Sequence, residues 1–389
     1  TLDNPNSENR SGKTVIELGT QTITYGAAIN ELLADTGIQK ELQNAPLGKA
    51  RNPPDQKNYY PPLGPIAESV SFPKKVMETA RFMQALNQQT LLDRPGFRGL
   101  PGKNLSMSID EWYEQNNFVY SKYFTMPFIS TGLCGVDYDR VPVAYMMKLY
   151  KVMLRLPLWR SITFVMRKVA PGNDLIWQRV ASELNVRYRQ AVSEVKINGS
   201  EIYIRNNAGE NLTFDRMIWT GRLPQLGKVL CESGNAPVSS RTHYGKVKYL
   251  RRAVFTYRIE GLERNYVWVH SDNIMRRMYG SPLITLNVKG SDWYTFYPWM
   301  SAGQTLDEVD RCIREFVSRL GARVISLVTE PMAWDYNPYF ESEMLEQGVF
   351  DQIENEQGKD GLYVCGETMS GISLAAVADY AKDLIERHF

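Results

Sequence analysis

Histidine and cysteine are scarce in this sequence of 389 residues. It has three histidines, and its four cysteines lie far apart with no CxxC pair. Because a zinc site needs clustered histidine, cysteine or carboxylate ligands, the sequence predicts no metal site. The scattered cysteines also give no disulfide framework, which favours a reducing compartment. We therefore expect a cytoplasmic protein.

An excess of one charge is equally absent. The 45 lysines and arginines nearly balance the 43 acidic residues and leave a net charge of +2 at pH 7. Such a balance gives no long-range attraction for nucleic acid. The sequence has no signal peptide and no uninterrupted apolar run that could span a bilayer. We expect no nucleic-acid partner and no integral membrane segment; no pattern fixes the oligomeric state, so a homodimer stays open.

What is present is enough apolar sequence for a large core. Hydrophobic residues make up 43% of the chain, and two domains or one large discontinuous domain are expected. Helical spacing predominates from Phe72 to Val169, and strand patterns return at residues 186–197, 201–206, 216–221 and 247–299. Residues 143–169 mix methionine, leucine and tryptophan with six cationic residues. They predict a buried helical layer broken at Pro157; a helix on a membrane surface is the alternative.

An aromatic strand and a capped helix follow. In "DWYTFYPWM", alternation places one set on one face, namely Trp293, Thr295, Tyr297 and Trp299, and a second set on the other, namely Tyr294 and Phe296. Thr305 and Glu308 then form a capping box, and Gly321 ends the helix. Its apolar stripe is Leu306, Val309, Ile313, Phe316, Val317 and Leu320.

The closing stretch, "GLYVCGETMSGISLAAVADYAKDLIERHF", has the most informative pattern. A continuous apolar run ending at Gly366 is typical of a buried parallel strand, and glycine lets a ligand approach the backbone closely. Gly371 and Ile372 are predicted to begin a helix, whose free N–H groups suit an anion or an electron-rich ring edge. Glu367 could accept hydrogen bonds from ribose-like hydroxyls. An ordinary strand, turn and helix with a surface glutamate is the alternative. The helix is predicted to bury Leu374, Val377, Ala378, Ala381, Leu384 and Ile385.

This stretch resembles the C-terminal flavin motif of the flavin-dependent amine oxidase superfamily, which also includes flavin desaturases and relatives of UDP-galactopyranose mutase. There, a strand ends in Gly-Asp/Glu and a helix of small residues points its N-terminus at the flavin pyrimidine. The resemblance implies FAD as cofactor and a small molecule as substrate. It implies that the cofactor is contacted by Gly366, Glu367, Gly371, Ile372 and Ser373.

Other segments are similar to the same superfamily in the same order. "GKTVIELGTQTI" is similar to the strand and turn beside the isoalloxazine, which implies contacts from Gly19, Thr20 and Gln21. "VRYRQAVSEV" is similar to the strand pair whose valine meets the adenine, a position that Val192 takes. "FDRMIWTGRLPQL" resembles the strand leaving the cofactor domain. "AWDYNPYF" resembles an aromatic stretch that borders the substrate cavity.

The GxGxxG turn of the superfamily is absent from the sequence. A βαβ half of that kind takes about 30 residues or more. We therefore expect it to lie upstream of Thr1, and we expect residues 1–389 alone to bind FAD weakly. The closing helix also reads "GISLAAVADYA" where the superfamily has further glycines.

In flavoenzymes the cofactor carries the hydride chemistry, and the protein positions substrate and tunes the ring. The resemblance implies a lysine near the flavin N5; Lys246 and Lys248 lie in that region, and we select Lys248, with a solvated lysine as the alternative. An aromatic set predicts a cage or lid above the flavin, or simply core packing: Trp293, Tyr297, Trp299, Trp334, Tyr336 and Tyr339. Within it, Trp299 and Tyr339 are assigned to catalysis, and Tyr297 and Trp334 to substrate binding.

Two arginine pairs offer bidentate recognition of a carboxylate or a pyrophosphate. They are Arg276 with Arg277, assigned to substrate binding, and Arg251 with Arg252. Surface ion pairing is the alternative use of each.

The predicted fold is α/β, with a Rossmann-like FAD-binding domain of the glutathione-reductase type interleaved with an α+β substrate domain. The FAD domain comprises residues 1–28, 172–235 and 345–389, with its first βαβ half upstream. The substrate domain comprises residues 29–171 and 236–344. The leading function is an FAD-dependent oxidoreductase that takes a hydride from an amine, an amino acid or a C–C bond. A mutase-like isomerase of a nucleotide sugar and a non-catalytic scaffold are the alternatives.

Overall fold

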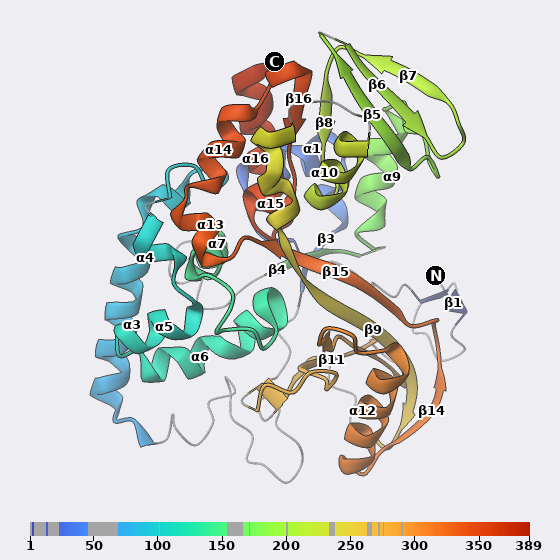
Figure 1. The fold of residues 1–389 in the computed structure, drawn as a ribbon. Coiled ribbons are helices and arrows are strands. Elements are labelled where there is room, and N and C mark those ends of the chain that lie inside the picture. The colour runs from blue at the N-terminus through green and yellow to red at the C-terminus, as the bar shows by residue number, and fades with distance from the viewer. Residues whose placement is uncertain are drawn as a thin grey trace.

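In the computed structural model the molecule combines a helical region, a large antiparallel sheet and a smaller region that holds the C-terminus (Figure 1). The structure describes residues 2–3, 13–14, 23–45, 69–100, 102–153, 166–170, 172–199, 201–232, 238–262, 267–270, 273–274, 276–288 and 291–389. Within these residues, no helix is long and apolar enough to cross a membrane. No group of histidine, cysteine, aspartate or glutamate in the same residues is arranged to hold a metal ion.

The helices between residues 72 and 153 are grouped on one side of the molecule (Figure 1). They are α3 (Phe72–Asn87), η2 (Thr90–Asp93), α4 (Gly102–Ser106), α5 (Ile109–Gln115), α6 (Val119–Ile129), η3 (Ser130–Cys134) and α7 (Val143–Met153). Every residue of α7 is buried. The prediction of a buried helical layer is therefore confirmed for α7, and the membrane-surface alternative is wrong there.

The helical prediction does not hold to its end, because β4 (Met166–Val169) is a strand. It pairs antiparallel with β3 (Leu42–Ala45). Helix α1 (Ala27–Asp35) is followed by η1 (Ile38–Glu41). Two short strands, β1 (Leu2–Asp3) and β2 (Lys13–Thr14), pair near the N-terminus.

The large sheet is organised around one long strand, β9 (Lys248–Glu260). On one edge β9 pairs with β15 (Met332–Tyr339) and then with β14 (Arg323–Leu327). On the other edge it pairs with β13 (Trp299–Met300) and then with β12 (Trp293–Phe296). Beyond β12 lie β11 (Ile284–Asn287) and β10 (Val267–Val269). All of these pairs are antiparallel.

Helix α12 (Leu306–Arg319) covers one face of this sheet, beside β9 and β14 in Figure 1. Thr305 and Glu308 form the predicted capping box, and Val309, Ile313 and Val317 are fully buried. The cluster beneath α12 takes alternate residues of β9 together with Tyr294 and Phe296: Ala253, Phe255, Tyr257 and Ile259. Residues 252, 254 and 256 of β9 therefore project from the opposite face. The presence of Tyr294 and Phe296 in this cluster agrees with the alternation predicted for residues 293–299.

The third region contains a parallel strand pair. β16 (Leu362–Val364) lies parallel to β8 (Met217–Trp219), as the apolar run predicted, and the pairing continues with Cys365 N–H donating to the Trp219 carbonyl at 2.9 Å. An antiparallel meander precedes β8 and comprises β5 (Val192–Asn198), β6 (Glu201–Asn206) and β7 (Asn211–Phe214). The sequence predicted β5, β6 and β8 but missed β7.

The remaining helices lie around these strands. They are α9 (Asp174–Ser182), α10 (Leu223–Glu232), η4 (Val238–Lys246), α13 (Ser342–Glu346), α14 (Val349–Glu356), η5 (Lys359–Gly361), α15 (Glu367–Ser370) and α16 (Leu374–His388). The mixed helix and sheet content agrees with the predicted α/β class. The division into an FAD domain and a substrate domain stays a prediction.

The closing helix differs from the prediction in start and phase. Residues 367–370 form the separate turn α15, and α16 begins at Leu374 with Ser373 as its N-cap. The buried side of α16 is Ala375, Ala376, Tyr380 and Leu384, whereas Ile385 is exposed. The reason is tertiary: a Cβ at Gly26, just before α1, would lie 2.8 Å from the Ala375 Cβ, so α1 determines which face of α16 is covered.

Candidate functional site

The turn between β16 and α16 combines two glycines in unusual backbone conformations. Gly366 has φ +102° and Gly371 has φ +89°, which only glycine adopts readily. Gly371 N–H donates to the Glu367 carbonyl at 2.9 Å, and the Ser370 hydroxyl donates to the Gly366 carbonyl at 3.0 Å. The Ser373 hydroxyl then accepts from the Ala376 N–H at 3.0 Å. This turn is therefore held rigidly at the carboxyl end of a parallel strand.

Glu367 is partly buried at the start of this turn. Burial raises the pKa of its carboxyl group above the usual value. Within the described part of the chain no donor forms a hydrogen bond to that carboxylate. A desolvated carboxylate without a donor is unfavourable, and it gains from a ligand that supplies hydroxyl or N–H groups.

A second group of predicted residues meets on the uncovered face of the large sheet. Arg252 of β9 lies opposite Trp299 of β13 on one edge of the strand and opposite Trp334 of β15 on the other edge. Directly opposed residues point to the same face. The Arg252 guanidinium carbon lies 5.0 Å from the ring centroid of Trp299, 5.0 Å from that of Tyr297 and 5.5 Å from that of Tyr336. We call Arg252, Tyr297, Trp299 and Tyr336 the arginine cage.

The arginine cage is enclosed by well-ordered packing. Trp299 is 1% exposed, and its indole N–H donates to the Ser130 carbonyl at 2.8 Å. Burial lowers the pKa of Arg252, and its Nε has no hydrogen-bond partner. The sequence predicted an aromatic cage for a ligand, but three of its six aromatic residues surround a cation that the protein itself supplies.

The cage and the turn are neighbours. Burial raises the pKa of Tyr336, nearby Arg252 opposes the rise, and Glu367 adds to it, so both charged groups lie near Tyr336. A second contact involves Tyr249 of β9. Burial raises the pKa of Tyr249, and a side-chain hydrogen bond with Thr368 of α15 opposes that rise. The glycine turn and the arginine cage therefore lie near each other, and together they make up the candidate site.

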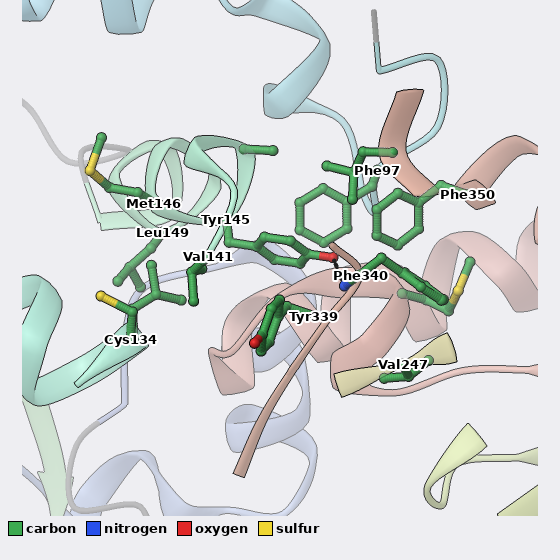
Figure 2. Close-up of a cluster of buried hydrophobic side chains, with 14 of the residues drawn as sticks. Phe97, Cys134, Val141, Tyr145, Met146, Leu149, Val247, Tyr339, Phe340 and Phe350 are labelled. Atoms are coloured by element: carbon green, nitrogen blue, oxygen red, sulfur yellow. Dashed lines mark hydrogen bonds between the residues drawn. The ribbon is translucent and has the colours of Figure 1, made fainter. Parts of the chain in front are cut away.

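Tyr339 packs among the buried side chains shown in Figure 2. It is 3% exposed, and its ring meets that of Tyr145 edge to face at a centroid distance of 6.4 Å. The Tyr145 hydroxyl accepts a hydrogen bond from the Phe340 N–H at 2.7 Å. Burial raises the pKa of Tyr339 to about 12. Its surroundings are those of a core residue, and its assignment to catalysis stays a prediction.

Lys248 and Arg277, which were predicted to act in the site, do not join the cage. Lys248 is half exposed, with its Nζ 3.9 Å from a carboxylate oxygen of Glu341. Arg277 donates to Asp110, and its second terminal nitrogen lies 3.5 Å from Asp139. Arg276 is exposed. The guanidinium of Arg277 is thus already engaged by two carboxylates, as the surface ion-pair alternative expects.

The remaining predicted cofactor residues are dispersed. Val192 begins β5 and pairs with Asn206 of β6. It is distant from the glycine turn in sequence, and its strand does not pair with β16. Gly19, Thr20 and Gln21 lie outside the described residues. The sequence analysis named Arg252 only as half of a pair. The signal that could have separated it from Arg251 is strand alternation, because Arg251 is exposed on the other face.

Residues 6–376 match the family described as flavin containing amine oxidoreductase. A match over nearly the whole chain shows that the protein belongs to this family. The resemblance inferred from the closing stretch is therefore confirmed, and with it a flavin as the cofactor of the family. No curated protein matches the sequence.

Solved structures of the same type share the fold. A fatty acid isomerase from P. acnes is similar with a TM-score of 0.82 and 18% identity, over 97% of this chain and 88% of that chain. A redesigned putrescine oxidase gives a TM-score of 0.63 and 12% identity, over 98% and 90% of the two chains. Cyclohexylamine oxidase from Brevibacterium oxydans gives 0.58 and 12%, over 96% and 88%.

Proposed function

We propose that this protein is an FAD-dependent oxidoreductase whose substrate lies between the glycine turn and the arginine cage. The observation that carries the proposal is the geometry of residues 364–373. A parallel strand ends in two glycines with positive φ, and a partly buried glutamate there has no donor among the described residues. In open α/β sheets, ligands bind beyond the carboxyl ends of the strands.

The residues of the turn suit a flavin with a hydroxylated side chain. Glu367 is an acceptor placed for hydroxyl groups, and Gly366 lets β16 pack closely on β8, since a Cβ there would lie 3.1 Å from the Thr220 carbonyl oxygen. Gly371 and Ser373 precede α16, whose first N–H groups favour an electron-rich ring edge. A bound flavin supplies the capacity to accept a hydride.

The protein's own residues then orient substrate and exclude water. Tyr297 and Trp299 are each less than 5% exposed and form an apolar wall around the Arg252 side chain. Tyr336 joins this wall to Glu367. Within the described residues the site holds no pair of acid and base in hydrogen-bond contact, which agrees with chemistry carried by a cofactor. The donor of the hydride is proposed to be an amine, an amino acid or a C–C bond.

An isomerase without net redox change is the second candidate. It is supported by the similarity of the whole fold to a fatty acid isomerase. A nucleotide-sugar mutase is supported less, because its pyrophosphate needs several cations at once. The Arg276 and Arg277 pair predicted for that purpose has Arg277 engaged by Asp110 and Asp139.

Absorption spectroscopy of purified protein tests the proposal. A flavoprotein shows flavin bands, and an oxidoreductase bleaches them when substrate is added without oxygen. An isomerase converts its substrate only after the flavin has been reduced with dithionite, and it consumes no acceptor. Protein that binds no flavin under any condition would contradict both candidates and leave a scaffold.

A further inference from the structure

Arg252 has no acidic partner within the described part of the chain, unlike Arg258 of the same strand. Arg258, six residues along the same strand, has its Nε 2.6 Å from Asp292. Arg252 instead has three aromatic rings within 5.5 Å of its guanidinium carbon, and its enclosed Nε makes no hydrogen bond. The residue keeps some solvent accessibility. It is therefore a desolvated cation that a small ligand can still reach.

Aromatic rings compensate only part of the loss of water. They attract a cation through their faces, but they give its five N–H donors no matching acceptors. A desolvated charge without an opposite charge is unfavourable, whereas the same charge beside an anion is strongly held. The guanidinium of arginine matches the two oxygens of a carboxylate in a bidentate arrangement. The missing partner of Arg252 is thus an anion with that shape.

The position of Arg252 places such an anion next to the proposed cofactor turn. Burial raises the pKa of Tyr336, the Arg252 cation opposes that rise and the Glu367 carboxylate adds to it, so both groups lie near Tyr336. The face of β9 that carries Arg252 is the one that α12 leaves uncovered. A ligand held by Arg252 would therefore extend along an aromatic wall toward Glu367.

We propose that Arg252 recognises the carboxylate of an organic acid substrate. The inference rests on the proposed function and narrows its substrate class, because neutral amines would leave Arg252 without its anion. A carboxylate is favoured over a pyrophosphate because one guanidinium satisfies one carboxylate. Fatty acids and amino acids both carry this group; an apolar tail distinguishes the first and an α-ammonium group the second.

Titration of the purified full chain, with and without added FAD, tests the proposal. The probes are oleate and L-phenylalanine, each compared with its primary amide. Quenching of tryptophan fluorescence reports binding, since Trp299 and Trp334 are the cross-strand partners of Arg252. We expect at least one carboxylate to bind about tenfold or more tightly than its amide. The acid that binds identifies the source of the carboxylate.

Variants at two adjacent positions give a matched comparison. Arg252→Met should weaken carboxylate binding about ten- to a hundredfold and leave amide binding unchanged. Arg252→Lys should restore part of the affinity, because it keeps the charge and loses the fork. Arg251→Met removes an equal charge from an exposed side chain on the opposite face and should change neither affinity.

Thermal unfolding distinguishes a ligand-binding role of Arg252 from a purely structural one. If Arg252 serves only to stack on the rings, Arg252→Met lowers the melting temperature and no carboxylate discriminates between the variants. If it is a ligand site, the ligand-free Arg252→Met variant melts at the same or a higher temperature, because a desolvated unpaired charge has been removed. Equal binding of acids and amides, no binding of either acid, or equal effects of Arg251→Met and Arg252→Met would each overturn the proposal.

The test of carboxylate binding by Arg252 can succeed or fail independently of the test of the proposed function. Flavin absorption and its bleaching report on the function, whereas tryptophan quenching does not require the flavin. Carboxylate binding that depends on Arg252 in a protein without flavin would sustain the inference and remove the function. If substrate bleaches the flavin and Arg252→Met leaves carboxylate binding unchanged, the proposed function is supported and the inference about Arg252 is wrong.

Discussion

The indole of Trp299 lies directly against the backbone of Gly135. A Cβ at Gly135 would fall 2.5 Å from the Trp299 Cγ, closer than packed carbon atoms approach. Gly135 also has φ +59°. The position of one wall of the arginine cage therefore depends on the absence of a side chain in a loop more than 160 residues away in sequence.

We expect Gly135→Ala to destabilise the protein by about 2–4 kcal/mol, combining overpacking with left-handed backbone strain. Gly303→Ala is the control: its φ is +80°, but a Cβ there meets nothing within 4 Å, so about 1–2 kcal/mol is expected from strain alone. Urea unfolding measures both. The near-ultraviolet circular dichroism of the tryptophans should change only in Gly135→Ala. Equal losses in the two variants would contradict close packing at Trp299.

Removal of the Glu367 carboxylate should weaken flavin binding. Glu367→Ala leaves the flavin hydroxyls without their acceptor, which corresponds to about 1–3 kcal/mol in affinity. Gly371→Val should be at least as severe, because its φ of +89° is unfavourable for a β-branched residue. Equilibrium dialysis against FAD gives the dissociation constants. If both variants retain flavin as well as the parent protein, the turn is an ordinary connection between strand and helix.

Glu367 should also make the flavin-free protein less stable as pH rises. Burial raises its folded-state pKa above the ordinary 4.5, so the folded state holds a proton that the unfolded state releases. Stability therefore falls as pH rises from about 4.5 through the raised pKa. Glu367→Gln should flatten this fall and be the more stable protein at pH 7. Glu330→Gln, at an exposed position, is the control. Parallel stability curves for parent and Glu367→Gln would contradict the burial of the charge.

His270 predicts the opposite dependence at acid pH. It is 2% exposed, its Nε2 lies 2.7 Å from the Thr285 hydroxyl, and burial lowers its pKa to about 3 from 6.5. Below pH 6.5 only the unfolded chain takes up the proton, so stability falls as pH falls. The contribution is about 2 kcal/mol between pH 6.5 and 5. His270→Gln should remove that slope in urea titrations, and His388→Gln, near the C-terminus, should not.

Local patterns predicted local structure well. The capping box of Thr305 and Glu308 marked the start of α12, and a short apolar run identified β16 as a parallel strand. Alternation in residues 293–299 assigned the aromatic side chains to the correct faces. In each case the spacing of apolar and polar residues within one short segment carries the information.

Features set by distant contacts were not predictable. The phase of α16 depends on Gly26, about 350 residues away, and its start follows the break at Gly371, whose φ is +89°. The arginine cage joins residues 252, 297–299 and 336, which no sequence spacing relates. Aromatic residues indicated a site for a cation, but only the register of β9 with β13 and β15 shows that Arg252 is that cation.

The pairing of β9 with strands on both of its edges has a consequence for how the site arises. Four strands, β12 to β15, take their register from this one segment, and they are contributed by chain that follows it by up to about 80 residues. Such long-range closure is slow and all-or-none compared with helix formation. Arg252 acquires its aromatic surroundings only when both edges are filled. In a nascent or truncated chain that ends before Tyr339, Arg252 would therefore be exposed to solvent and would form no partial site. Carboxylate binding would arise in one step, when the sheet is complete.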